Sequence, residues 1–89
     1  MALYCRQEGV LSQSIEGEAV LYDTKNERYF SLNEAGTLLW EGLQQPTSLE
    51  QLQDKLFEVY EVSRETLETD ICELLESLEQ AGLIILSET

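Results

Sequence analysis

Residues 28–36 read Arg-Tyr-Phe-Ser-Leu-Asn-Glu-Ala-Gly. The spacing of apolar residues changes within this stretch from a strand-like to a helical pattern, and this change decides the fold. Phe30 and Leu32 are separated by one polar residue, so both side chains fall on the same face of an extended chain. The alternation stops at Asn33, a residue type that caps helices because its side chain accepts hydrogen bonds from the first free backbone N–H groups. The stretch therefore predicts a strand over residues 28–32 that leads directly into a helix.

Upstream of this stretch, the sequence predicts two further strands. Residues 18–23 (Glu-Ala-Val-Leu-Tyr-Asp) are rich in residues that favour strands, and residues 10–15 show a weaker pattern of the same kind. Residues 24–27 are polar and contain an Asn, which tolerates a left-handed backbone, so they suit a hairpin loop. A turn at residues 16–17 (Glu-Gly) completes a three-stranded antiparallel meander. For residues 1–8 the sequence allows either a flexible segment or an extra strand.

Downstream, capping residues and helical spacing predict three helices. The first occupies residues 33–43, and the second lies within residues 47–60, where two capping-box patterns overlap at its start. The third begins after Ser63, ends before Gly82 and carries one apolar stripe. The stripe consists of Leu67, Ile71, Leu74 and Leu78. Residues 83–86 form an apolar tail that either adds a short strand or covers the core.

Strands followed by helices predict an α+β fold that is winged-helix-like, with an N-terminal three-stranded antiparallel sheet followed by three helices. The helices are expected to cover one face of the sheet. A length of 89 residues suits a single domain spanning residues 1–89. A chain of this size buries too little surface to enclose a large ligand cavity as well.

The composition excludes several classes of function. Eighteen acidic residues against five basic ones give a net charge of −13, which disfavours nucleic acid as a partner because its phosphates carry the same sign. The chain has no His, which removes His-dependent nucleophiles and most zinc sites. It shows neither a membrane span nor a signal-peptide pattern. We therefore expect a soluble, cytoplasmic and non-catalytic chain that takes no metal or cofactor.

The cysteines and aromatic residues favour structural roles. Cys5 and Cys72 form no metal-binding pair and are expected as free thiols, with Cys72 partly buried beside Leu75. One apolar group is expected in the core rather than on a binding platform. It consists of Leu38, Leu39, Trp40 and Phe57.

Acidic residues crowd the third predicted helix, and two interpretations of them stay open. They are Glu65, Glu68, Asp70, Glu73, Glu76 and Glu79. They either form a solvated face that keeps a small protein soluble or create a field that attracts a basic partner segment.

The free edge of the sheet is the feature through which a small domain without a cavity can bind a partner. A terminal strand exposes unpaired N–H and C=O groups, to which an extended peptide can add as a further strand. Residues 28–32 are the candidate edge. Their short length and Arg28 also suit ordinary protection against aggregation, so both interpretations stay open at this point.

The sequence resembles the PqqD-like family over residues 10–86. The resemblance is carried by residues 18–23, residues 28–36, Leu39-Trp40-Glu41, Ser48-Leu49 with Leu52, Asp70-Ile71, Leu74-Leu75 and Gly82-Leu83. The Tyr-Phe-x-Leu-Asn-x-x-Gly segment is its most telling part. In its short length, with no fused enzyme, the chain resembles the members of this family that occur with lasso-peptide maturation systems.

This resemblance implies a RiPP recognition element, a non-catalytic domain that binds the leader of a ribosomally made precursor peptide. It implies that the leader adds as a strand beside the third strand, in the groove against the third helix. On the strand side the matching residues are Arg28, Tyr29, Phe30, Ser31 and Leu32, and on the helix side they are Asp70, Ile71, Leu74 and Leu75. In lasso systems, the resemblance further implies that a Tyr and a Pro of the leader occupy apolar pockets. A cysteine protease of the same pathway is the implied partner, and the cyclase is left open as another.

One departure and two alternatives remain. The family's hairpin usually holds a Gly near its tip, where this chain has Asn26-Glu27, and Asn is the best non-Gly residue at positive φ. The alternative functions are a winged-helix transcription regulator and a general adaptor subunit that binds another protein through its helices.

Overall fold

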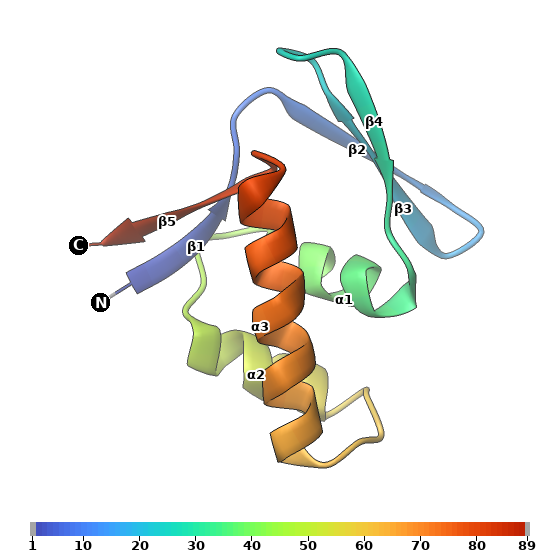
Figure 1. The fold of residues 1–89 in the computed structure, drawn as a ribbon. Helices are drawn as coiled ribbons and strands as arrows, with labels where there is room; N and C mark the ends of the chain where they lie inside the picture. Colours follow the sequence, from blue (N-terminus) through green and yellow to red (C-terminus); the bar gives the residue numbers. More distant parts are fainter. Residues whose placement is uncertain (1, 89) are drawn as a thin grey trace.

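The computed structural model describes residues 2–88 and has an α+β architecture with three helices (Figure 1). The strands are β1 (Ala2–Arg6), β2 (Val10–Ile15), β3 (Glu18–Asp23), β4 (Arg28–Ser31) and β5 (Ile84–Glu88). The helices are α1 (Glu34–Gly42), α2 (Leu49–Phe57) and α3 (Arg64–Gln80). The predicted fold class, an antiparallel sheet followed by three helices, is confirmed. Within residues 2–88, none of the helices is both long and apolar enough to cross a membrane.

Strands β2, β3 and β4 form the predicted antiparallel meander, with β3 in the centre. The turn between β2 and β3 has positive φ at both central residues, 53° at Glu16 and 83° at Gly17. Tight two-residue hairpin loops need this backbone because it matches the twist of the flanking strands. The strand order leaves β4 at one edge of the sheet and β2 at the other.

The loop between β3 and β4 is organised by the buried carboxylate of Asp23. This carboxylate accepts hydrogen bonds from the backbone N–H of Lys25 at 3.0 Å and from the side-chain amide of Asn26 at 2.9 Å. The expectation that Asn26 would take the left-handed backbone is wrong, because both its backbone N–H and its side-chain amide are bonded to Asp23 and its φ is not positive. Glu27 takes the positive φ instead, at 53°.

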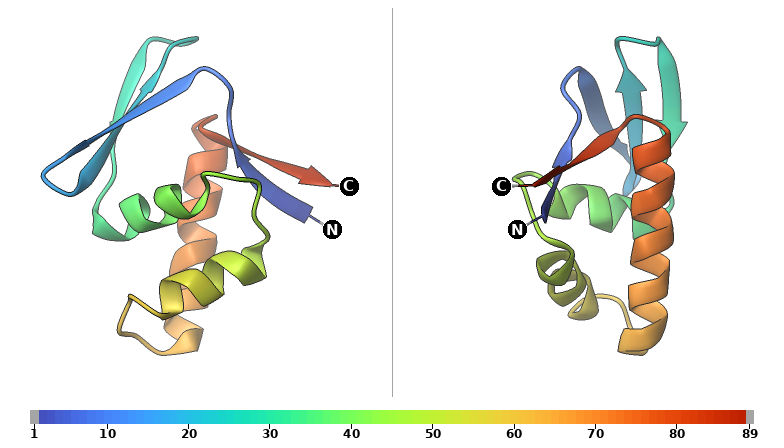
Figure 2. Two further views of the ribbon diagram at one scale, coloured as in Figure 1. Left: turned by 180° about the vertical axis from the view of Figure 1, so that it is seen from behind. Right: turned by 60° about the vertical axis from the view of Figure 1, so that its left-hand side comes forward.

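The two ends of the described chain pair with each other in a separate antiparallel ribbon, β1 with β5 (Figure 2). The question left open for residues 1–8 is thus answered by a strand over residues 2–6, and the apolar tail forms a strand as well. The other side of β1 meets Thr47, with Tyr4 N–H donating to Thr47 O at 2.8 Å. The ribbon therefore lies apart from the β2–β3–β4 sheet and pairs with neither of its edges.

The core lies between the sheet, the β1–β5 ribbon and the buried sides of all three helices. The buried stripe of α3 consists of Leu67, Ile71, Leu75 and Leu78, whereas the sequence predicted Leu74 in place of Leu75. Both sets fit helical spacing, and adjacent positions differ by only about 100° around the helix. The difference matters for the site, because it places Leu74 at the margin of the core, half-buried.

Two further burial predictions are wrong because they also depended on which side of a helix faces the core. Phe57 is 40% exposed, and its ring contacts the guanidinium of Arg64 at 4.6 Å, because the buried face of α2 is set by Leu52 and Leu56. Cys72 is exposed rather than partly buried, since it directly follows Ile71 on the helix and points away from the core. Leu39 and Trp40 are buried as expected, and Leu38 is half-buried.

The junction between β4 and α1 depends on the hydroxyl of Thr37. Leu32 N–H donates to Ala19 O at 2.9 Å, which is one half of a normal antiparallel pair. In place of the other half, Ala19 N–H donates to Thr37 Oγ1 at 2.9 Å, and this hydroxyl donates to Leu32 O at 3.4 Å. The inserted hydroxyl ends the ladder, and Asn33 then caps α1 by accepting from Gly36 N–H. The chain therefore leaves the sheet immediately after β4.

We expect Thr37→Val to lower the free energy of unfolding by about 1–3 kcal/mol, because Ala19 N–H loses its partner in a buried place. Urea unfolding measures the change. Thr24→Val is the matched control, since its hydroxyl donates to Gly9 O on the exposed surface, and we expect a smaller loss there. Equal stability of Thr37→Val and the unchanged protein would contradict this account of the junction.

Asp23 should make stability depend on pH. Its pKa is lowered from the usual 3.8, first by the side-chain hydrogen bond from Asn26 and further by backbone N–H groups and Arg28. The charged form therefore stabilises the fold above pH 3.8, and this contribution is lost as the pH falls through the folded value. We expect Asp23→Asn to be less stable than the unchanged protein at neutral pH, and urea midpoints should converge in acid. A gap that persists unchanged at acidic pH would contradict the assignment.

Candidate functional site

The outer edge of β4 carries unpaired backbone groups. Neighbouring residues of an antiparallel strand direct their N–H and C=O groups alternately to the two sides. The bond from Leu32 N–H to Ala19 O fixes the phase, so Arg28 and Phe30 face β3, while Tyr29 and Ser31 face outward. Among residues 2–88, no backbone hydrogen bond uses these outward groups of Tyr29 and Ser31. This edge is therefore open to a further strand.

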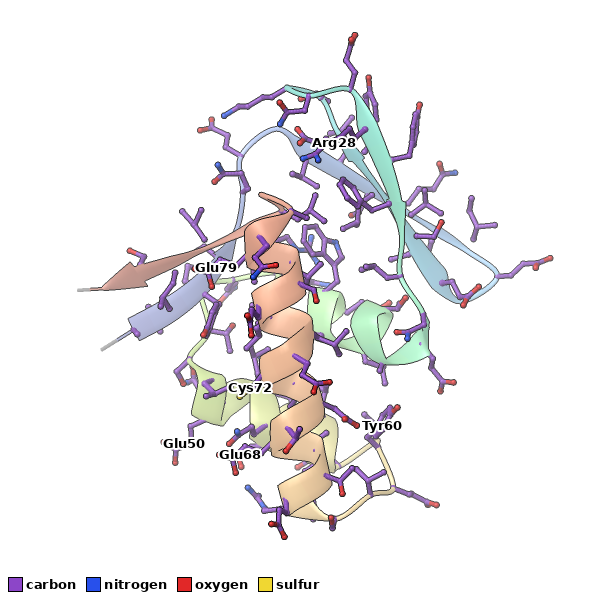
Figure 3. All side chains as sticks on the ribbon, viewed as in Figure 1. Arg28, Glu50, Tyr60, Glu68, Cys72 and Glu79 are labelled. Carbon is purple, nitrogen blue, oxygen red and sulfur yellow. The ribbon has the colours of Figure 1, made fainter. Side chains whose placement is uncertain are left out.

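The first residue of β4 is fastened to the end of α3. The guanidinium of Arg28 donates to Ala81 O at 3.0 Å and lies 3.7 Å from the carboxylate of Asp23. It also lies 5.2 Å from the ring centre of Phe30, which packs against the core from the same face of the strand. These contacts tie the start of β4 to the C-terminal end of α3, and Figure 3 labels Arg28 above this end of the helix.

A groove of about 310 Å³ lies between α3, the start of α1 and the segment before α3. Its lining residues are Asn33, Ala35, Tyr60, Asp70, Glu73, Leu74 and Ser77. Asn33 follows β4 within two residues, so the groove opens where the free edge ends. Tyr60 approaches it from the segment between α2 and α3 (Figure 3).

The structure places the residues that the sequence assigned to this site in separate groups, because none of residues 28–32 lines the groove. The strand-side residues Arg28–Ser31 form β4, and Leu32 follows directly. On the helix side, Asp70 and Leu74 line the groove. Ile71 and Leu75, in contrast, are 1% and 2% exposed and belong to the core beneath it, so their assignment as surface contacts is corrected.

Sequence reasoning missed five of the lining residues: Asn33, Ala35, Tyr60, Glu73 and Ser77. Spacing could have found two of them, since Glu73 and Ser77 lie three and seven positions after Asp70 and so share its side of the helix. Tyr60 has no such signal, because it lies in a connection whose path depends on how α2 and α3 pack.

The groove combines an apolar floor with an acidic rim. Leu74 and Ala35 are half-buried and supply the apolar surface. Asp70 and Glu73 add two carboxylates, on a helix whose one basic residue, Arg64, is paired with Asp54 at 3.0 Å. The exposed Cys72 is absent from the lining. The groove can therefore accommodate an apolar side chain and offers hydrogen-bond acceptors around it.

Comparisons with known proteins agree with this geometry. Residues 18–84 match the family described as coenzyme PQQ synthesis protein D (PqqD). A solved structure of TbiB1 in complex with the TbiA(beta) leader peptide is 29% identical, with a TM-score of 0.84 over 90% of this chain and 93% of that chain. A lasso peptide synthetase B1 complexed with the leader peptide is 26% identical, with a TM-score of 0.80 over 92% and 96%.

No curated protein gives a significant sequence match. The family match nevertheless spans most of the chain and includes β3, β4 and all three helices. The resemblance inferred from the sequence is thus confirmed, and this chain belongs to the PqqD family.

Proposed function

We propose that this chain binds the leader segment of a ribosomally synthesised precursor peptide by strand addition to β4. The observation that carries the proposal is the open edge at Tyr29 and Ser31, which lies beside a groove of suitable size. Two similar structures contain leader peptides, and one of those proteins is a lasso peptide synthetase B1. The proposed setting is therefore lasso-peptide biosynthesis.

Backbone pairing would supply only part of the affinity. Tyr29 and Ser31 each offer one donor and one acceptor, so an added antiparallel strand forms about four hydrogen bonds with β4. At about 1 kcal/mol net for each, these contribute roughly half of the 8 kcal/mol that micromolar affinity needs. Side chains of the peptide must therefore supply the remainder.

The groove is the proposed location of the main side-chain anchor. Side chains of an added strand alternate between two faces, so every second residue of the leader would point toward α3. The apolar surface of Leu74 and Ala35 would receive an aromatic or proline side chain, and Asp70 could accept a hydrogen bond from a tyrosine hydroxyl. The Tyr and Pro anchors implied by the family resemblance suit these requirements.

We further propose that the chain is not itself an enzyme and that it delivers the bound precursor to the maturation protease. The protease would bring its own nucleophile and base, and this chain would raise the local concentration of the cleavage site. The cyclase of the pathway is a second proposed recipient. The net charge of −13 argues against the alternative of a transcription regulator, because DNA would be repelled.

The strand-addition step can be tested with Ser31→Pro. Its N–H faces outward, so proline removes a donor for the peptide without breaking the ladder with β3. We expect the affinity for labelled leader peptide to fall about tenfold or more, measured by fluorescence anisotropy.

Ser12→Pro is the matched control, because Ser12 N–H faces outward on the opposite edge, β2. Leader affinity should be unchanged in this variant. If both folded variants bind the leader as tightly as the unchanged protein does, strand addition at β4 is wrong.

The groove can be tested with Leu74→Asp, which places a charge on its apolar floor. We expect leader affinity to fall about tenfold or more, because the anchor side chain would then meet an ionised group. Leu11→Asp makes the same replacement at a 61% exposed leucine on the other face of the sheet and should bind the leader normally. Circular dichroism checks that both variants fold. Normal binding by a folded Leu74→Asp variant would exclude this groove as the anchor site.

A further inference from the structure

The second edge of the sheet, β2, is also open. Thr24 N–H donates to Gly9 O, so Gly9 directs its backbone groups toward β3, and so does every second residue after it, including Gln13, which pairs with Val20. The outward backbone groups of β2 therefore belong to Val10, Ser12 and Ser14. No backbone hydrogen bond within residues 2–88 uses the outward N–H or C=O of Ser12 or Ser14. All five residues from Leu11 to Ile15 are exposed.

This edge lacks the usual protection against pairing. Natural edge strands are commonly guarded by a charged residue, a proline or a covering segment. Residues 10–15 contain neither a charged residue nor a proline. Exposed apolar side chains lie next to the open backbone, with Leu11 at 61% and Ile15 at 52% exposure. By contrast, β4 begins with Arg28, and the outer side of β1 is covered by Thr47.

Negative charge stands at both ends of this uncharged strand. Glu8 precedes it, and Glu16 and Glu18 follow it. At the second end, a depression of about 510 Å³ is lined by further carboxylates of α1. Its lining residues are Glu16, Gly17, Glu18, Glu34, Thr37, Leu38 and Glu41. A strand that pairs with β2 would therefore place one end among several carboxylates and its other end beside Glu8, where the Lys25 side chain also lies against Gly9.

The charges argue against a second copy of this chain as the occupant. In the two-fold antiparallel register that pairs Ser12 with its symmetry mate, Glu8 of each copy would lie opposite Glu16 of the other. Like charges placed opposite each other destabilise strand pairs. Each copy would also carry a net charge of −13 into the contact.

We propose that β2 pairs with an edge strand of a different protein, and that this strand is uncharged in its centre and carries Lys or Arg at both ends. Its backbone pairs with Ser12 and Ser14, its apolar side chains contact Leu11 and Ile15, and its basic ends meet Glu8 and Glu16. Because β3 separates β2 from β4, this partner and a leader peptide can occupy the sheet at the same time. The proposal does not depend on leader binding.

A synthetic β-hairpin peptide whose outer strand reads Lys-Val-Thr-Val-Thr-Val-Thr-Thr-Lys is the probe, because its two Lys residues are as far apart in register as Glu8 and Glu16. Amide hydrogen exchange by NMR is followed in the full chain with and without the hairpin. We expect exchange at Ser12 and Ser14 to slow about tenfold or more, with little change at Tyr29 and Ser31. A hairpin with Glu in place of both Lys residues should bind about tenfold more weakly.

Two variants separate this edge from the β4 edge. Ser12→Pro should abolish protection by the hairpin, whereas Ser31→Pro should retain it. If Ser12→Pro does not fold, the exposed pair Glu8→Lys and Glu16→Lys serves instead and should reverse the preference between the Lys and Glu hairpins.

The proposal is overturned if the Lys hairpin protects neither Ser12 nor Ser14, or if it protects only Tyr29 and Ser31. Protection of Ser12 that rises with protein concentration in the absence of any peptide would assign the edge to a second copy instead. Leader titrations of the same samples report on β4 separately, so failure at one edge is distinguishable from failure at the other.

Discussion

The Thr37 hydroxyl, inserted between Ala19 N–H and Leu32 C=O, is the constraint on which the rest of the site depends. It replaces a ladder bond at the end of β4 and so turns the chain out of the sheet and into α1. Because the chain leaves at this point, no later segment within residues 2–88 pairs with the outer side of β4. The same junction places Asn33 at the mouth of the groove. One buried hydroxyl thus connects the fold to the open edge.

Much of the fold could be predicted from local sequence. Three signals are each carried by a few neighbouring residues. They are the alternation of apolar and polar residues over residues 28–32, the helix cap at Asn33 and the polar loop before β4. The position of β4 at an edge follows from a meander in which it is the last strand. The β1–β5 pair was not predictable in this way, because its partners are about eighty residues apart and neither has a clear period.

The errors within the site have one physical origin. Leu74 and Leu75 both satisfy helical spacing, and only the packing of α3 against α2 and β5 decides which of them is buried. That choice of a single position leaves Leu74 as the apolar floor of the groove and removes Ile71 and Leu75 from the surface. Phe57 and Cys72 were misplaced by the same uncertainty in helix rotation. Residue type and spacing therefore locate a helical site to within about one position, and tertiary packing decides the rest.

Amide hydrogen exchange at Tyr29 and Ser31 tests the central claim most directly, because these two residues carry the outward backbone groups of β4. The measurement compares the chain alone with the chain saturated by leader peptide. Strand addition predicts strong protection of both amides when leader is bound and unchanged exchange at Ser12 and Ser14. Saturated leader binding that leaves Tyr29 and Ser31 as fast as in the free chain would contradict the account.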